Sequence, residues 1–113
     1  MTKAKVLYGT ELAGYILETD EGYEFYYDLN YLNNDDARPV SLTLPLTDTT
    51  YKNKTLFPFF DGLIPEGWLL DLAAEHWKIK TNDRFQLLLA TCSDAIGAVS
   101  IIADETLNTN EHG

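Results

Sequence analysis

The chain has 113 residues, 45% of them hydrophobic, which gives room for one folded domain with a real core. Eight basic residues against 18 acidic ones give a formal net charge of −10 at pH 7. That charge repels nucleic-acid phosphate, so direct binding of DNA or RNA is not expected. It would attract a basic protein surface, although acidity can also serve solubility alone.

The single cysteine, Cys92, leaves no partner for an internal disulfide. It stands beside an apolar run, which predicts a small buried hydrophobe and not a nucleophile. The first residues lack an apolar stretch of signal-peptide length, and no segment reaches the length of a membrane span. These features predict a cytoplasmic protein without membrane contact.

The first part of the chain predicts an antiparallel meander of three strands over residues 6–8, 12–17 and 23–27. A tight turn over residues 19–22 joins the second and third strands, and Gly22 suits a positive φ there. Residues 29–32 can form one helical turn. Seven tyrosines in the chain favour a sheet with one wetter face.

A fourth strand is predicted over residues 40–44, because apolar and polar residues alternate there. Val40, Leu42 and Leu44 should all face the core. Pro45 ends the strand or marks a sheet edge, and residues 48–54 read as a polar connection.

Helical segments follow. Pro58 suits the first position of a helix. The dense apolar residues nearby are expected to anchor the core; they are Phe57, Phe59, Phe60 and Leu63. Further helices are predicted over residues 66–77 and from a cap at Thr81 or Asn82 to about Ala90. A last strand over residues 98–102 completes an α+β domain of residues 1–103, with about three helices packed on an antiparallel sheet. Residues 104–113 read as a polar, flexible tail.

The patterns of common enzymes are missing from the sequence. It has no Gly-rich phosphate loop followed by Lys-Ser/Thr, and neither a His-Arg-Asp nor an Asp-Phe-Gly motif. His76 and His112 do not combine with Cys92 in a metal-binding spacing. The sequence therefore predicts no catalytic residue, no cofactor and no metal, and the chain is not expected to be an enzyme.

Three residues of the apolar and glycine-containing segments are expected to set the local backbone conformation. Asp94 can close a turn ahead of Gly97, which precedes the last strand. Gly67 follows Pro-Glu at a helix start. Both glycines are predicted to be conformational requirements and not contact residues.

A helical wheel of residues 66–77 places Trp68 beside the acidic residues Asp71 and Glu75, away from the centre of the apolar arc. Two interpretations stay open. Trp68 can be an anchor for a protein partner, flanked by that acidic stripe. Alternatively, it can fold under the turn formed by Pro65, Glu66 and Gly67 as a helix staple.

Three dense segments carry a family resemblance: residues 37–46 (ARPVSLTLPL), 59–70 (FFDGLIPEGWLL) and 94–99 (DAIGAV). Together they resemble the N-terminal subdomain of the HipA-type Ser/Thr kinase toxins over about residues 5–103. The family often has Gly-Arg before the aspartate that matches Asp94, where this chain has Cys92 and Ser93. That departure puts a basic role for this loop in doubt.

The resemblance implies a protein similar to HipS, the antitoxin of tripartite HipB–HipS–HipT systems. Such an antitoxin binds and neutralises a HipT- or HipA-like Ser/Thr kinase, and a HipB-like DNA-binding protein completes the complex. Partner-binding residues are then expected at Pro65, Glu66, Trp68, Asp71 and Glu75. The alternative is a structural subunit, or detached subdomain, that supports assembly of the kinase without inhibiting it.

Overall fold

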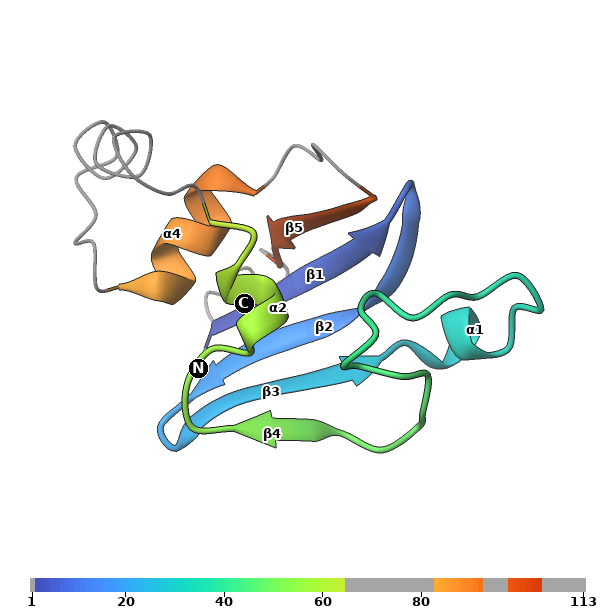
Figure 1. Ribbon diagram of the computed structural model, residues 1–113, viewed down its shortest axis with the longest axis horizontal. Helices are drawn as coiled ribbons and strands as arrows, with labels where there is room; N and C mark the ends of the chain where they lie inside the picture. Colours follow the sequence, from blue (N-terminus) through green and yellow to red (C-terminus); the bar gives the residue numbers. More distant parts are fainter. Residues whose placement is uncertain (1, 65–82, 93–97, 105–113) are drawn as a thin grey trace, which may run out of the picture.

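A five-stranded antiparallel sheet in the order β4-β3-β2-β1-β5 forms the centre of the domain (Figure 1). The computed structural model describes residues 2–64, 83–92 and 98–104. The strands are β1 (Thr2–Tyr8), β2 (Glu11–Thr19), β3 (Gly22–Tyr27), β4 (Tyr51–Asn53) and β5 (Val99–Ala103). The helices of the described residues are α1 (Leu29–Leu32), α2 (Pro58–Asp61) and α4 (Arg84–Thr91). The predicted α+β class is confirmed.

The predicted meander of β1, β2 and β3 is present, with β5 added antiparallel to β1. Gly22, where the β2–β3 turn ends, has a φ of +143°. A Cβ atom there would lie 2.4 Å from the carbonyl oxygen of Asn53 in β4. Both the backbone angle and the close approach of a neighbouring strand therefore require glycine at this turn.

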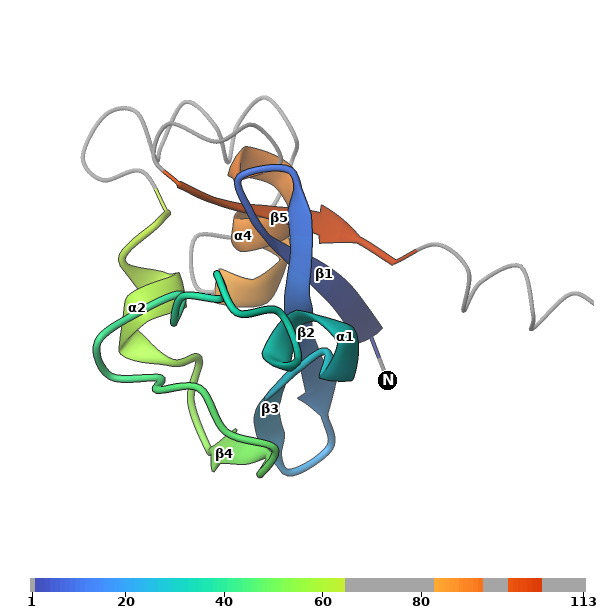
Figure 2. The ribbon, with the colours of Figure 1, turned by 90° about the vertical axis from the view of Figure 1, so that its right-hand side faces the viewer.

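The core lies between one face of the sheet and the helices α2 and α4, which Figure 2 shows on the same side of the sheet. Phe25 of β3, Phe60 of α2 and Phe85 of α4 are fully buried. The ring centroids of Phe25 and Phe60 lie 5.4 Å apart. Burial of side chains of this size stabilises the fold by about 1.5–3 kcal/mol each. Phe57 and Phe60 are buried as predicted, whereas the other two predicted anchors, Phe59 and Leu63, are only partly buried and pack against the core.

The opposite face of the sheet carries partly exposed tyrosines, as the tyrosine-rich composition predicts. Tyr15 of β2 and Tyr26 of β3 pair across the strands, with ring centroids 5.4 Å apart. The Lys3 ammonium lies 4.2 Å from the centroid of the Tyr15 ring. This geometry is a cation–π contact, and it covers part of the aromatic surface that α2 and α4 leave free.

The predicted strand over residues 40–44 is wrong. Only an isolated bridge joins Ser41 and Leu44, and Leu42 is 95% exposed while Val40 and Leu44 are buried. The fourth strand is β4 instead, within the segment predicted to be a polar connection, and it pairs with β3. The prediction from alternation failed because the backbone of residues 40–44 forms hydrogen bonds with a tyrosine hydroxyl and within the segment itself. The segment therefore does not pair with a strand of the sheet.

The helix starts follow ordinary capping chemistry. Pro58 is in the first turn of α2, as predicted. Helix α4 is capped by Asp83, whose carboxylate accepts a hydrogen bond from the backbone N–H of Gln86. The prediction of Thr81 or Asn82 as the cap is therefore wrong by one or two positions, because the nearer carboxylate takes that role.

Candidate functional site

An apolar groove of about 440 Å³ lies where the chain segments before β5, around α2 and after α1 meet. It is lined by Tyr8, Pro39, Val40, Ser41, Leu42, Phe59, Leu63, Ala98 and Val99. None of these nine residues is charged, in a chain of which 23% is charged. Depletion of charge is typical of the centre of a protein interface.

The groove brings together the three segments that stand out in the sequence. Residues 39–42 belong to the first of them, Phe59 and Leu63 to the second, and Ala98 and Val99 to the third. Each segment stands out in the sequence by its own residue pattern, but those patterns do not predict that the three segments lie together in the fold. Their convergence on one uncharged surface makes the groove the candidate functional site.

The buried hydroxyl of Tyr27 holds the loop that forms one wall of the groove. Tyr27 of β3 donates a hydrogen bond to the carbonyl oxygen of Leu44 and accepts one from the backbone N–H of Val40, at 3.0 Å. Burial of the phenol raises the pKa of Tyr27 to about 12. The hydroxyl therefore stays protonated and can donate over the whole physiological range of pH.

Two further tyrosines hold the ends of the same loop. The hydroxyl of Tyr31 donates to the carbonyl oxygen of Arg38 at 2.6 Å and accepts from the N–H of the same residue at 3.1 Å. The hydroxyl of Tyr51 donates to the carbonyl oxygen of Pro45 at 2.6 Å. Residues 38–45, called the tyrosine-held loop below, are thus fixed from β3, α1 and β4. Tyrosine-rich composition was the signal in the sequence, but it did not identify these partners.

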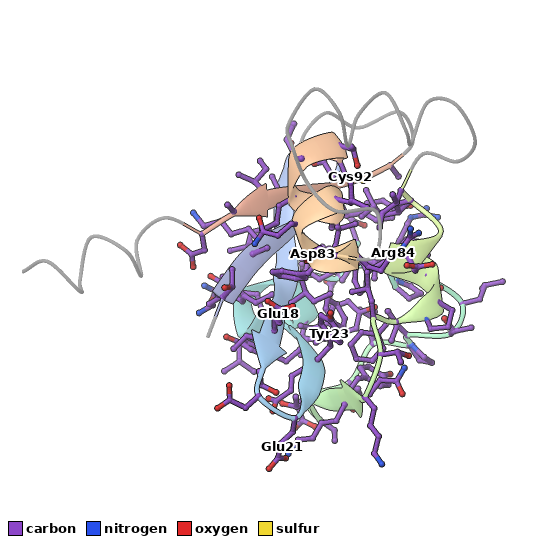
Figure 3. The ribbon with its side chains drawn as sticks, turned by 90° about the vertical axis from the view of Figure 1, so that its left-hand side faces the viewer. Glu18, Glu21, Tyr23, Asp83, Arg84 and Cys92 are labelled. Carbon is purple, nitrogen blue, oxygen red and sulfur yellow. The ribbon has the colours of Figure 1, made fainter. Side chains whose placement is uncertain are left out.

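Helix α4 fixes the other wall of the groove. The thiol of Cys92, at the end of α4, donates to the carbonyl oxygen of Leu63 at 3.3 Å. At the start of α4, the Nε of Arg84 lies 2.7 Å from a carboxylate oxygen of Asp61 in α2; Figure 3 labels Arg84 and Cys92 at the two ends of the helix. Burial raises the pKa of the Cys92 thiol, which disfavours the nucleophilic thiolate. The prediction of a buried, structural cysteine is confirmed.

A second, wider hollow of about 720 Å³ lies at the β2–β3 turn and β4. Charged side chains line it, among them Glu21, Lys52 and Lys54. Beside it, the Tyr23 hydroxyl donates to a carboxylate oxygen of Glu18 at 3.3 Å, and burial together with that carboxylate raises the pKa of Tyr23; Figure 3 shows both residues. None of the three marked segments contributes to this hollow, so the apolar groove is the better candidate despite its smaller volume.

The predicted partner-binding and structural residues lie outside the residues that the structure describes. They are Pro65, Glu66, Gly67, Trp68, Asp71, Glu75, Asp94 and Gly97. The roles assigned to them from sequence stay predictions. Some described residues close to them in the chain line the groove: Leu63 precedes Pro65 by two positions, and Ala98 directly follows Gly97.

Within residues 2–64, 83–92 and 98–104, no group of three or more His, Cys, Asp or Glu residues could hold a metal ion. No helix in the described part of the chain is long and apolar enough to cross a membrane. The chemistry that the described site can offer is apolar contact with a neighbouring surface. The fold and the groove thus define a small α+β domain with an uncharged groove on its surface.

Comparison with known proteins identifies the family of this domain. The model of the HipA N-terminal domain family matches residues 4–102, and the chain belongs to that family. An uncharacterized protein of Haemophilus influenzae is 38% identical over 95 residues, which cover 84% of this chain and 85% of that protein. A solved structure of the N-terminal domain of HipA toxin superposes with a TM-score of 0.70 at 30% identity, covering 93% of this chain and 94% of that one. The family predicted from the three segments is confirmed.

Proposed function

We propose that this chain binds a HipA-like Ser/Thr kinase and neutralises it, as the antitoxin of a tripartite HipB–HipS–HipT-type system. The observation that carries the proposal is the family match over residues 4–102, to a domain that is part of a toxin in the solved relative. The Haemophilus influenzae relative is matched over 85% of its length, so the similarity extends over most of that protein.

The charge and the groove support a protein partner. A net charge of −10 favours association with a basic surface and speeds the encounter at low salt. The uncharged groove offers an apolar contact once the two surfaces meet. In this proposal a HipB-like protein supplies the contact with DNA, which the acidic chain does not make itself.

The test is co-expression of this chain with the HipA-like kinase of the same organism, with growth and kinase level measured together. The proposal predicts restored growth at an undiminished level of soluble kinase. A matched control is the kinase expressed with the destabilised variant Phe60→Ala. If the kinase level rises and growth stays arrested, the chain is a supporting subunit and the antitoxin proposal is wrong.

Trp68 is proposed as the anchor of this interaction, with Asp71 and Glu75 beside it facing basic groups of the kinase. Loss of a tryptophan anchor costs roughly 2–4 kcal/mol, which corresponds to about a 30- to 1000-fold weaker affinity. The measurement is binding of Trp68→Ala to the kinase, with circular dichroism to establish folding. A folded variant that binds and neutralises like the wild type would assign Trp68 to the staple role.

A further inference from the structure

Leu42 is the most exposed large hydrophobic residue of the described chain, at 95%. It lies in the wall of the uncharged groove. Its neighbours close a small turn beneath it, in which the N–H of Thr43 donates to the Ser41 hydroxyl at 3.2 Å. A leucine in this position gains nothing for folding, because its side chain stays in water in the free domain.

The backbone that carries Leu42 is nevertheless held firmly. Tyr27, Tyr31 and Tyr51 bond to the backbone of the loop on both sides of Leu42. Val40 and Leu44, the two flanking apolar residues, are buried in the core. Binding through a surface that is already ordered avoids the entropic cost of fixing a loop. Rigid presentation of an exposed apolar residue is therefore suited to docking.

We propose that Leu42 is a docking residue that inserts into an apolar pocket of the HipA-like kinase, and that Tyr27 is a positioning residue for it. The inference rests on the proposed function. The neutral groove calls for an equally neutral, apolar partner surface. The matched solved structure is the N-terminal domain of a toxin, and a domain of a larger protein generally has an interface with its neighbours.

A second copy of this chain is the less suitable occupant. Each copy carries a net charge of −10, and two such copies repel each other as they approach. A kinase with a basic surface around an apolar pocket would complement two features of this chain. The basic surface would attract its negative charge, and the apolar pocket would match the uncharged groove. The kinase is therefore the proposed partner of this surface.

The experiment compares Leu42→Ala with Leu29→Ala in binding to the purified kinase. Leu29 of α1 is 67% exposed and lies outside the groove, so it is a matched control for loss of an exposed leucine. Because both side chains are exposed, both variants should unfold at the wild-type denaturant concentration. Leu42→Ala is expected to raise the Kd by about tenfold or more, and Leu29→Ala by less than about twofold.

The role of Tyr27 is tested by a double-mutant cycle. Tyr27→Phe removes the hydroxyl and keeps the ring, so it should weaken kinase binding of the folded chain. If Tyr27 acts by positioning Leu42, Tyr27→Phe has little further effect on binding in the Leu42→Ala background. Equal losses in both backgrounds would show that Tyr27 does not act through Leu42.

The possible outcomes separate the inference from the proposed function. Absence of binding by the wild-type chain would overturn the proposed function and the inference together. Binding by the wild type that Leu42→Ala and Leu29→Ala leave equally strong would overturn the inference alone. Concentration-dependent self-association of the wild type that Leu42→Ala abolishes, with kinase binding unchanged, would make a second copy the occupant and also overturn it.

Discussion

The β1–β3 meander and the tyrosine-held loop share an alternation of apolar and polar residues, but their backbones have different hydrogen-bond partners. In the meander, the backbone groups bond to neighbouring strands and the apolar side chains fill one face. In the loop, the backbone bonds to tyrosine hydroxyls, and only two of its three alternating apolar residues, Val40 and Leu44, are buried. Alternation therefore identifies a strand only where another strand is available to pair with it. Where it is not, an apolar residue such as Leu42 is left for other contacts.

The largest expected difference between the two regions is in stability. Phe60→Ala, beneath the meander, should lower the free energy of unfolding by about 3–5 kcal/mol, because a fully buried ring leaves a cavity. Leu42→Ala should change it by less than about 0.5 kcal/mol, since that side chain is exposed. Urea denaturation measures both. A loss of several kcal/mol in Leu42→Ala would mean that the loop belongs to the core.

The next effect concerns the hydroxyl that holds the loop. Tyr27→Phe leaves the N–H of Val40 and the carbonyl oxygen of Leu44 without that partner, which should cost about 1–3 kcal/mol. Tyr15→Phe, on the partly exposed face of the sheet, is the control and should cost little. Amide hydrogen exchange adds a local measurement, in which the Val40 amide should exchange faster in Tyr27→Phe. Unchanged protection would show that other contacts hold the loop.

High pH should remove part of the stabilisation that the protonated Tyr27 hydroxyl provides. The pKa of Tyr27 is about 12 in the folded chain and 10.0 for a free tyrosine. The unfolded chain therefore loses this proton first, so the stabilisation is complete below pH 10 and falls as the pH rises towards 12. The free energy of unfolding, measured at pH 9 and pH 11, should decline more in the wild type than in Tyr27→Phe. Equal declines would contradict the burial of this phenol.

The smallest effect is expected at the ion pair between α2 and α4. Arg84 and Asp61 have side chains that are 31% and 42% exposed, so solvent screens their attraction. Arg84→Ala should cost about 0.2–1 kcal/mol, and part of this cost should vanish at high salt. Thermal melts at low and high salt test this expectation. A cost that is large and independent of salt would indicate that the Arg84 side chain contributes through packing.

The sequence predicted the meander, the aromatic core and the family, because each depends on local patterns. It did not predict β4, because Tyr51–Asn53 is short and polar. This segment is a strand because β3 lies beside it and pairs with it. It also missed the requirement at Gly14, where a Cβ atom would lie 2.3 Å from the carbonyl oxygen of Tyr26 on the neighbouring strand. The groove was missed for the same reason, because contacts between distant segments leave no trace in residue spacing.

Neutralisation of the kinase is tested most directly by the phosphotransfer activity of the purified HipA-like kinase as this chain is added. Activity should fall with added chain and reach a low plateau, with the half-inhibition concentration raised by Leu42→Ala and unchanged by Leu29→Ala. A stable complex whose kinase activity equals that of the free kinase would contradict neutralisation and assign the chain a supporting role.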